Sequence, residues 1–358
     1  MSDQAVYFTA QAMTDFAFAL LRAAGMDEDK ASTVARLLVL TDMMGRRTHG
    51  MAMAPLYLAD IRKGGMVLDG LPEVIKDTGS TMVWDGRYLP GLWLMARAID
   101  TAASRIANHG VVTVAIRRSH HIGCLAALTR QAAQSGLVAI IANSDPAAKR
   151  VAPYGGTEAL FSPDPFAIGY PGQEHPVLVD MCASITTTSM TRQKVAAGEL
   201  FEQPWLLDAD GQPTRDPRVL EVSERRGSLQ SIGGLDYGHK GFGLALMIEA
   251  LSQGLSGHGR RDAPARWGGN VFLQLLDPDF FAGRDAFGEQ TNFFSDRCRA
   301  NRPIDPGQPV RVPGDQTARS IAAASHEGIG FGPMVWDSLQ ACARDYGVAL
   351  PQVRQGTF

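Results

Sequence analysis

Two adjacent histidines near the middle of the chain are the residues best suited to acid–base chemistry. His120 and His121 follow the apolar run at 111–116 and stand in the segment Arg-Ser-His-His-Ile-Gly-Cys of 118–124. A buried strand that ends in titratable groups is where α/β enzymes place their chemistry. Imidazole has an ordinary pKa of about 6.5, so it gives or takes a proton near neutral pH. The segment therefore favours general acid–base catalysis over a surface turn that happens to contain two histidines.

A third histidine lies in the short motif Thr48-His49-Gly50, directly after Arg46 and Arg47. A hydroxyl beside an imidazole can orient the ring or relay its proton, and the glycine lets the backbone turn sharply. Thr48 and His49 are therefore candidate catalytic residues. A helix cap with a solvated histidine is the alternative interpretation.

Phosphate binding is predicted at a glycine-containing helix start and not at a standard nucleotide fingerprint. The chain has no Gly-x-Gly-x-x-Gly, and the nearest P-loop analogue, at 233–240, has a histidine in place of the lysine. However, Gly238-His239-Lys240-Gly241 opens a predicted helix at 241–252, where backbone N–H groups and an ammonium attract phosphate. A non-standard nucleotide site or a plain glycine-rich helix entry would both fit.

A metal site is the alternative for the central segment, because His120, His121 and Cys124 fall within five residues. The side chains of adjacent histidines diverge, and no His-x-x-x-His or Cys-x-x-Cys supplies further ligands. We expect no metal. A metal-dependent hydrolase or lyase that uses these three residues remains a second hypothesis.

The elements that must position these groups alternate along the middle of the chain. Helical spacing predicts helices at 9–25, 27–43 and 51–63, before any convincing strand. A strand at 81–84 then leads into an alternating series, which indicates an α/β sheet domain. The series consists of a helix at 90–109, a strand at 111–116, a helix at 126–135 and a strand at 138–142.

The tail returns to helix at about 333–344, and we expect it to pack with the N-terminal helices. The predicted division is a helical lobe at 1–78, an α/β domain at 79–310, and a C-terminal segment at 311–358 that packs on the helical lobe.

Composition excludes several function classes. The chain has 358 residues, 45% of them hydrophobic, and 34 Lys plus Arg against 37 Asp plus Glu, a net charge of -3. No basic stripe suggests a nucleic-acid partner. Four cysteines without a Cys-x-x-Cys pair and a start without a signal sequence predict a cytoplasmic protein. The apolar runs are shorter than the ~20 residues of a membrane span.

Seven motifs, taken in sequence order, resemble one family over about residues 8–350. They are Thr48-His49-Gly50, Ser-His-His-Ile-Gly at 119–123, Asn143-Ser144, Ala-Pro-Tyr-Gly-Gly at 152–156, Asp-Met-Cys-Ala-Ser at 180–184, Gly238-His239-Lys240-Gly241 and Val312-Pro313-Gly314-Asp315. The chain resembles the malate/L-lactate dehydrogenase family of NAD(P)-dependent oxidoreductases, and within it the hydroxycarboxylate dehydrogenase branch.

The resemblance implies a fold and an activity. The fold is α/β, with a mixed-sheet, non-Rossmann NAD(P)-binding domain and a helical lobe formed from both termini, in a homodimer. The activity is the interconversion of a small 2-hydroxy acid, or an imino-acid analogue, with its 2-oxo or cyclic imine form. The proton donor would be either His49, with Thr48 beside it, or His121, and only geometry can choose.

The resemblance also implies where NAD or NADP binds, without choosing between them. The predicted cofactor residues are His120, His121, Ile122, Gly123, Cys124, Leu125, Asp180, Met181, Cys182, His239, Lys240, Gly241, Pro313, Gly314 and Asp315.

Departures from the family pattern concern the substrate. Met44 and Met53 stand where relatives often carry arginine, Pro163 replaces a threonine, and Met190 replaces a lysine or aspartate. Each exchange removes a polar group, so we expect a less polar pocket, or a catalytically inactive cofactor-binding homologue. Arg192, Arg46 or Arg47 could replace the lost carboxylate anchor. The predicted substrate residues are Arg47, Met53, Tyr57, Pro163 and Arg192.

Overall fold

A seven-stranded mixed sheet forms the centre of the molecule in a computed structural model that describes residues 5–222 and 224–354. The strand order is β2-β3-β4-β11-β5-β6-β7, with β3 parallel to β4 and every other neighbouring pair antiparallel. The strands are β2 (Glu73–Asp77), β3 (Thr81–Asp85), β4 (Val111–Ser119), β11 (Gly269–Leu276), β5 (Val138–Ser144), β6 (Pro165–Tyr170) and β7 (Val177–Cys182). The predicted mixed α/β fold is confirmed.

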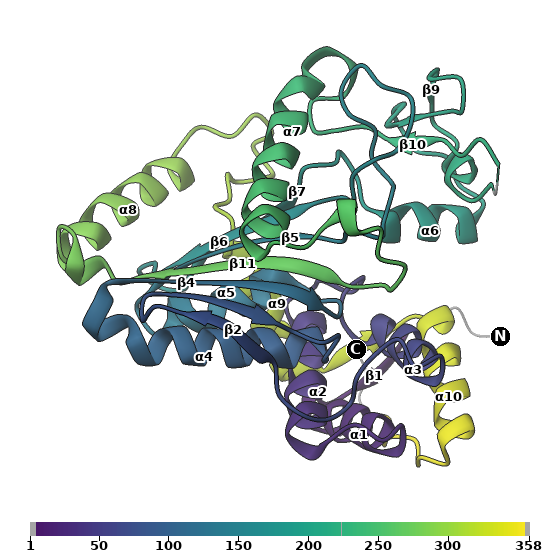
Figure 1. Cartoon of the computed structure of the whole chain (residues 1–358), viewed down its shortest axis with the longest axis horizontal. Helices are drawn as coiled ribbons and strands as arrows, with labels where there is room; N and C mark the ends of the chain where they lie inside the picture. The colour runs from purple at the N-terminus through teal and green to yellow at the C-terminus, as the bar shows by residue number, and fades with distance from the viewer. Residues whose placement is uncertain (1–4, 223, 355–358) are drawn as a thin grey trace.

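Helices cover both faces of this sheet (Figure 1). Helices α4 (Gly91–His109) and α5 (Leu125–Gln134) pack on one face, and α7 (Gly234–Glu249) with the π-helical turn η3 (Ala250–Gly254) packs on the other. The central strands are apolar on both sides because both faces are buried. Gly110, with a φ of 69°, ends α4 and returns the chain directly into β4.

Both ends of the chain build the helical lobe (Figure 1). It contains α1 (Ala10–Ala23), α2 (Glu28–Met43), the 3₁₀ turn η1 (Met51–Met53), α3 (Ala54–Arg62) and α10 (Pro333–Tyr346). Strand β1 (Val6–Phe8) pairs antiparallel with β12 (Ile329–Phe331). The Trp336 ring of α10 packs 4.5 Å from the ring of Phe8, which ties the tail to the N-terminal segment.

The remaining elements extend from the sheet. A three-stranded sheet of β10 (Ser228–Leu229), β8 (Leu206–Leu207) and β9 (Pro213–Thr214) lies beyond α6 (Thr188–Ala197), with the turns η2 (Pro217–Leu220), η4 (Arg260–Asp262) and η5 (Pro278–Phe280) between elements. Helix α8 (Arg284–Arg299) projects from the edge of the molecule, and α9 (Asp315–Glu327) follows it (Figure 1).

The structure differs from the sequence-based elements in several places. Strand β2 lies inside 1–78, the range predicted as helical, and α7 begins at Gly234, earlier than predicted, with a non-helical Tyr237 in its second turn. Strand β11 and helices α8 and α9 were not predicted. Among the described residues, no helix combines the length and apolar character that crossing a membrane requires.

Candidate active site

The turn after β4 is packed directly against the start of α4. A methyl group on Gly91 would lie 2.3 Å from the carbonyl oxygen of His120 and 2.4 Å from that of His121. The Ser119 hydroxyl donates to the His120 carbonyl at 2.7 Å, and the His120 amide donates to the Leu89 carbonyl at 3.2 Å. These contacts fix the backbone of the two histidines, whose rings share Tyr57 and Trp267 as neighbours but differ in their other contacts.

His120 is turned into the protein, toward α3. It is fully buried, and its Nε2 lies 3.0 Å from the carboxylate of Asp60. Its ring centroid is 4.8 Å from that of Trp267, edge to face. Burial lowers the pKa of His120, and Asp60 partly opposes this effect. These contacts support a structural role for His120, although the sequence placed it among the cofactor residues.

The ring of His121 lies against that of His49. The two imidazoles are stacked with centroids 5.9 Å apart, and Trp267 packs 5.2 Å from the His121 ring. The Tyr57 hydroxyl lies 2.8 Å from Nδ1 of His121, and the Gly123 amide donates to the same nitrogen at 3.4 Å. Because a backbone N–H can only donate, Nδ1 is an acceptor and the ring hydrogen is assigned to Nε2.

Electrostatics keep His121 neutral and leave His49 more easily protonated. Burial, reinforced by the charges of His49 and His120, holds the pKa of His121 well below its ordinary value. Burial also lowers the pKa of His49, but the carboxylate of Asp180 opposes it, while Arg46 adds to the lowering. Thr48 Oγ1 lies 2.9 Å from His49 Nδ1.

Asp180 joins β7 to the start of α5. Its carboxylate accepts from the amide of Ala126 at 2.9 Å and from the Cys124 thiol at 3.5 Å. A helix N-terminus stabilises a carboxylate in this position. Burial raises the pKa of both Cys124 and Cys182 to about 12, which favours the protonated thiols over the thiolates.

Three of the segments predicted to bind the cofactor meet β7 at successive points. The start of α5 meets it at Asp180. The part of α7 that follows the non-helical Tyr237 is close-packed against the residue after β7, because a methyl group on Gly241 would lie 2.9 Å from the Ala183 carbonyl. The loop at 312–315 lies against it too, because a methyl group on Gly314 would be 2.4 Å from the Pro176 carbonyl.

The side chains at these points differ in what they offer a ligand. Met181, His239 and Lys240 are exposed, and Pro313 is exposed with its carbonyl bonded to Leu178. The carboxylate of Asp315 lies 2.8 Å from the Arg299 guanidinium and 3.3 Å from the His175 ring. Ile122, Gly123 and Leu125 are buried where the turn after β4 leads into α5. An exposed cation and a helix start beside a strand fit a long ligand that carries phosphates.

The predicted substrate residues are divided. The Tyr57 hydroxyl contacts His121, and Met53 is buried on η1. Arg46 and Arg47 are both exposed; the charge of Arg47 acts on Asp42, whereas that of Arg46 acts on His49.

The other two predicted substrate residues have no contact with the imidazoles among the interactions described. Pro163 accepts from the amides of Ala183 and Ser184 through its carbonyl. Arg192 is exposed on α6.

Sequence reasoning missed Trp267 and Asp60, which contact the two histidines. Neither residue lies in a recognisable motif, and Trp267 is separated from His121 by most of the α/β domain. No local signal could have connected these residues to the imidazoles.

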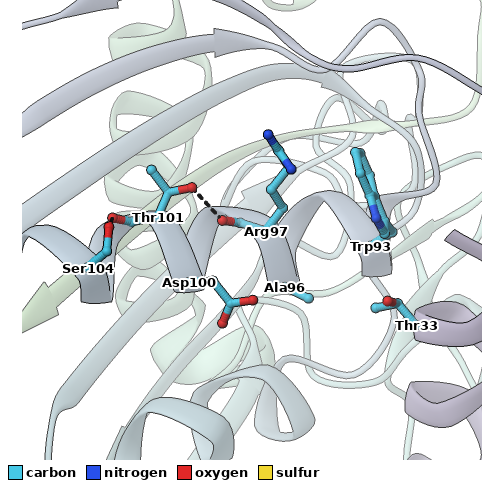
Figure 2. Close-up of a pocket in the computed structure, with 7 residues that line it drawn as sticks. All are labelled: Thr33, Trp93, Ala96, Arg97, Asp100, Thr101 and Ser104. Carbon is cyan, nitrogen blue, oxygen red and sulfur yellow. Dashed lines mark hydrogen bonds between the residues drawn. The ribbon is translucent and has the colours of Figure 1, made fainter. Parts of the chain in front are cut away.

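A separate hollow of about 390 Å³ lies on α4. Figure 2 shows its lining side chains, which follow α4 from Trp93 to Ser104, with Thr33 contributed by α2. None of the predicted site residues lines it. Within 5–222 and 224–354, no group of three His, Cys, Asp or Glu side chains converges as a metal site.

Comparisons with known proteins agree over nearly the whole chain. A family model described as malate/L-lactate dehydrogenase matches residues 8–340. An L-lactate dehydrogenase of Cupriavidus necator is 31% identical over 340 residues, which cover 93% of this chain and 95% of the relative. Hydroxycarboxylate dehydrogenase B of Escherichia coli K12 is 28% identical over 348 residues, covering 95% and 94%.

The fold is similar to that of a solved enzyme as well. The crystal structure of malate dehydrogenase from Entamoeba histolytica superposes with a TM-score of 0.91, covering 98% of this chain and 100% of that one, at 22% identity.

Proposed function

Because the chain belongs to the malate/L-lactate dehydrogenase family, we propose that it interconverts a 2-hydroxy acid, or its imino-acid analogue, with the 2-oxo or cyclic imine form. Membership confirms the predicted dehydrogenase class and a nicotinamide cofactor, NAD or NADP. The observation that carries the proposal is the stacking of His49 on His121, with centroids 5.9 Å apart, although the two come from different lobes.

His49 is the proton donor in this proposal. Reduction of a carbonyl group requires one proton at the oxygen while a hydride reaches the carbon. Burial favours the neutral form of His121, and in the assigned tautomer its Nε2–H is a hydrogen-bond donor, which suits it to orient and polarise the carbonyl oxygen. Burial lowers the pKa of His49, but Asp180 opposes this effect, and we assign to His49 the step that gives the proton in reduction and takes it in oxidation. Thr48 orients His49 through Nδ1.

The bound cofactor would supply or accept the hydride. The exposed Lys240, which follows the non-helical Tyr237 in α7, would hold its phosphates. Met181, which is exposed beside Asp180, would offer an apolar surface for its rings. The exposure and the close backbone packing of these three segments support this assignment.

Arg46 is the proposed anchor for the substrate carboxylate. Its charge acts on both His49 and Cys124, whereas that of Arg47 acts on Asp42, and this difference supports the choice of Arg46. Replacement of Arg46 by Met should raise KM about 10- to 100-fold, the value of one charge-assisted hydrogen bond to a carboxylate, and Arg47→Met is the matched control. Equal effects of the two variants would contradict this assignment.

The proposed activity is tested with a panel of 2-oxo acids and cyclic imines, monitored by nicotinamide absorbance with NADH and with NADPH. His49→Asn should lower kcat by roughly 100-fold or more while the affinity for the cofactor is kept. His121→Asn should lower it as well. Full activity of both variants refutes the assignment. Tight cofactor binding without turnover of any compound would favour the inactive homologue.

We also propose a cytoplasmic homodimer that uses α8. Phe293 and Phe294 are 65% and 70% exposed on this projecting helix, and the largest exposed apolar patches on soluble proteins mark interfaces. The four free cysteines fit a reducing compartment. Light scattering should give twice the chain mass for the wild type and the chain mass for Phe293→Asp/Phe294→Asp. The exposed Met334→Asp on α10 is the control.

A further inference from the structure

A buried carboxyl group lies directly beneath the turn that carries His49. Asp42 stands in the last turn of α2 and is 6% exposed. Its Oδ2 accepts a hydrogen bond from the amide of Met51 at 2.7 Å. Its own carbonyl accepts from the Gly45 amide at 2.9 Å, at the point where the chain leaves the helix. One residue therefore contacts both ends of the segment that connects α2 to η1.

Gly50 shows how closely the carboxylate approaches this segment. A methyl group on Gly50 would lie 2.2 Å from Oδ1 and 2.5 Å from Oδ2 of Asp42. Gly50 has a φ of −88° and a ψ of −136°, a combination outside the α and β regions that residues with a side chain favour. The carboxylate occupies the space that any other side chain would need.

We propose that Asp42 is a positioning residue for the reaction, and that its carboxylate holds His49 in register with His121. It acts on the backbone immediately after His49, at Gly50 and Met51, and it does not touch the ring. A second bond, from the His49 amide to the Arg46 carbonyl at 3.0 Å, holds the other side of the turn. The proposal rests on the proposed role of His49 as proton donor.

Burying the carboxylate of Asp42 costs free energy. A residue that served only to pack would avoid that cost. Burial raises the pKa of Asp42 to about 7, although the Met51 hydrogen bond and the charge of Arg47 act in the opposite direction. An apolar side chain of similar size would avoid that cost. Such a side chain could not accept a hydrogen bond from the Met51 amide, and it would therefore not hold the turn in place.

The test compares Asp42→Leu, which keeps the branching of the side chain, is larger and has no acceptor, with Asp42→Asn, which keeps one acceptor oxygen. For Asp42→Leu we expect kcat to fall about 10- to 100-fold with KM and cofactor affinity nearly unchanged, because a small misplacement of a reacting group has effects of this size. Asp42→Asn should recover to within a few-fold of the wild type. Wild-type kcat in Asp42→Leu, or a failure of Asp42→Asn to recover, overturns the proposal.

A second readout does not need any substrate. The His49 resonance in a ¹H–¹³C spectrum, identified by its loss in His49→Asn, should broaden or shift in Asp42→Leu, while that of the exposed His109 stays unchanged. If Asp42→Leu fails to fold, Gly50→Ala replaces it, since the added methyl group must displace the carboxylate. An unchanged His49 resonance in the folded variant refutes the role of Asp42. Absence of turnover in the wild type with a changed His49 resonance refutes the proposed function alone.

Discussion

The hydrogen bond from Tyr57 to His121 gives the sharpest test of how the site is organised. Tyr57 is fully buried on α3, and burial raises the pKa of its hydroxyl, so it remains a donor at every working pH. Replacement by Phe keeps the ring and removes the donor. Nδ1 of His121 is then left with the Gly123 amide alone, at 3.4 Å, which is a weak interaction.

The expected effect follows from the value of one hydrogen bond. A net contribution of about 0.5–1.5 kcal/mol corresponds to roughly a 2- to 12-fold change in the population of the Nε2–H tautomer. We expect kcat/KM of Tyr57→Phe to fall within that range. The ¹⁵N shifts of His121 should show a mixture of tautomers in place of one.

The matched control is Tyr346→Phe, which removes a hydroxyl that bonds the Leu58 carbonyl at 3.4 Å, on the far side of α3. It should leave the tautomer and the rate unchanged. A loss above about 1,000-fold in Tyr57→Phe would identify Tyr57 itself as the proton donor and refute the roles given to the imidazoles. Unchanged ¹⁵N shifts would refute the tautomer assignment.

Three further predictions concern packing and charge. In Gly91→Ala the added methyl group would meet the His120 carbonyl at 2.3 Å, so the free energy of unfolding measured in urea should fall by about 1–3 kcal/mol and the activity should fall as well. Gly243 has open space around it, so in Gly243→Ala the free energy of unfolding should rise by up to about 1 kcal/mol. Burial raises the pKa of Asp85, but bonds from Arg118 and its neighbours outweigh this and hold it below the ordinary value. The free energy of unfolding of Asp85→Asn should therefore be about 1–3 kcal/mol below that of the wild type at pH 7, where the carboxylate contributes fully. This difference between variant and wild type should disappear as the pH falls through the pKa of Asp85 in the folded state. The pKa of Asp42 is raised to about 7 from 3.8, so the folded state binds the extra proton between those values and wild-type stability falls as pH rises from 4 to 7. The free energy of unfolding of Asp42→Asn, taken relative to that of the wild type, should rise by up to about 4 kcal/mol between pH 4 and pH 8. A constant difference across that range would contradict the raised pKa of Asp42.

The long apolar elements could be predicted from the sequence because their signal is local. The helix predicted at 90–109 is observed as Gly91–His109, and the strands predicted at 111–116 and 138–142 form the cores of β4 and β5. Strand β11 was not predicted, although it lies between β4 and β5 and pairs with both. Its partners are more than a hundred residues away in the chain, so its place in the sheet depends on contacts that no short window contains.

The sequence by itself determined which residue types are available for chemistry, namely three histidines on two turns, a lysine at a helix start, and a family pattern that links them. Only the tertiary structure decided that His121 faces His49 while the adjacent His120 is buried against Asp60. It also brought Trp267 and Asp42 to the histidines and the turn that carries them. The physical reason is that neighbouring side chains point in different directions, and the partners that select a direction, a tautomer or a charge come from other elements of the fold.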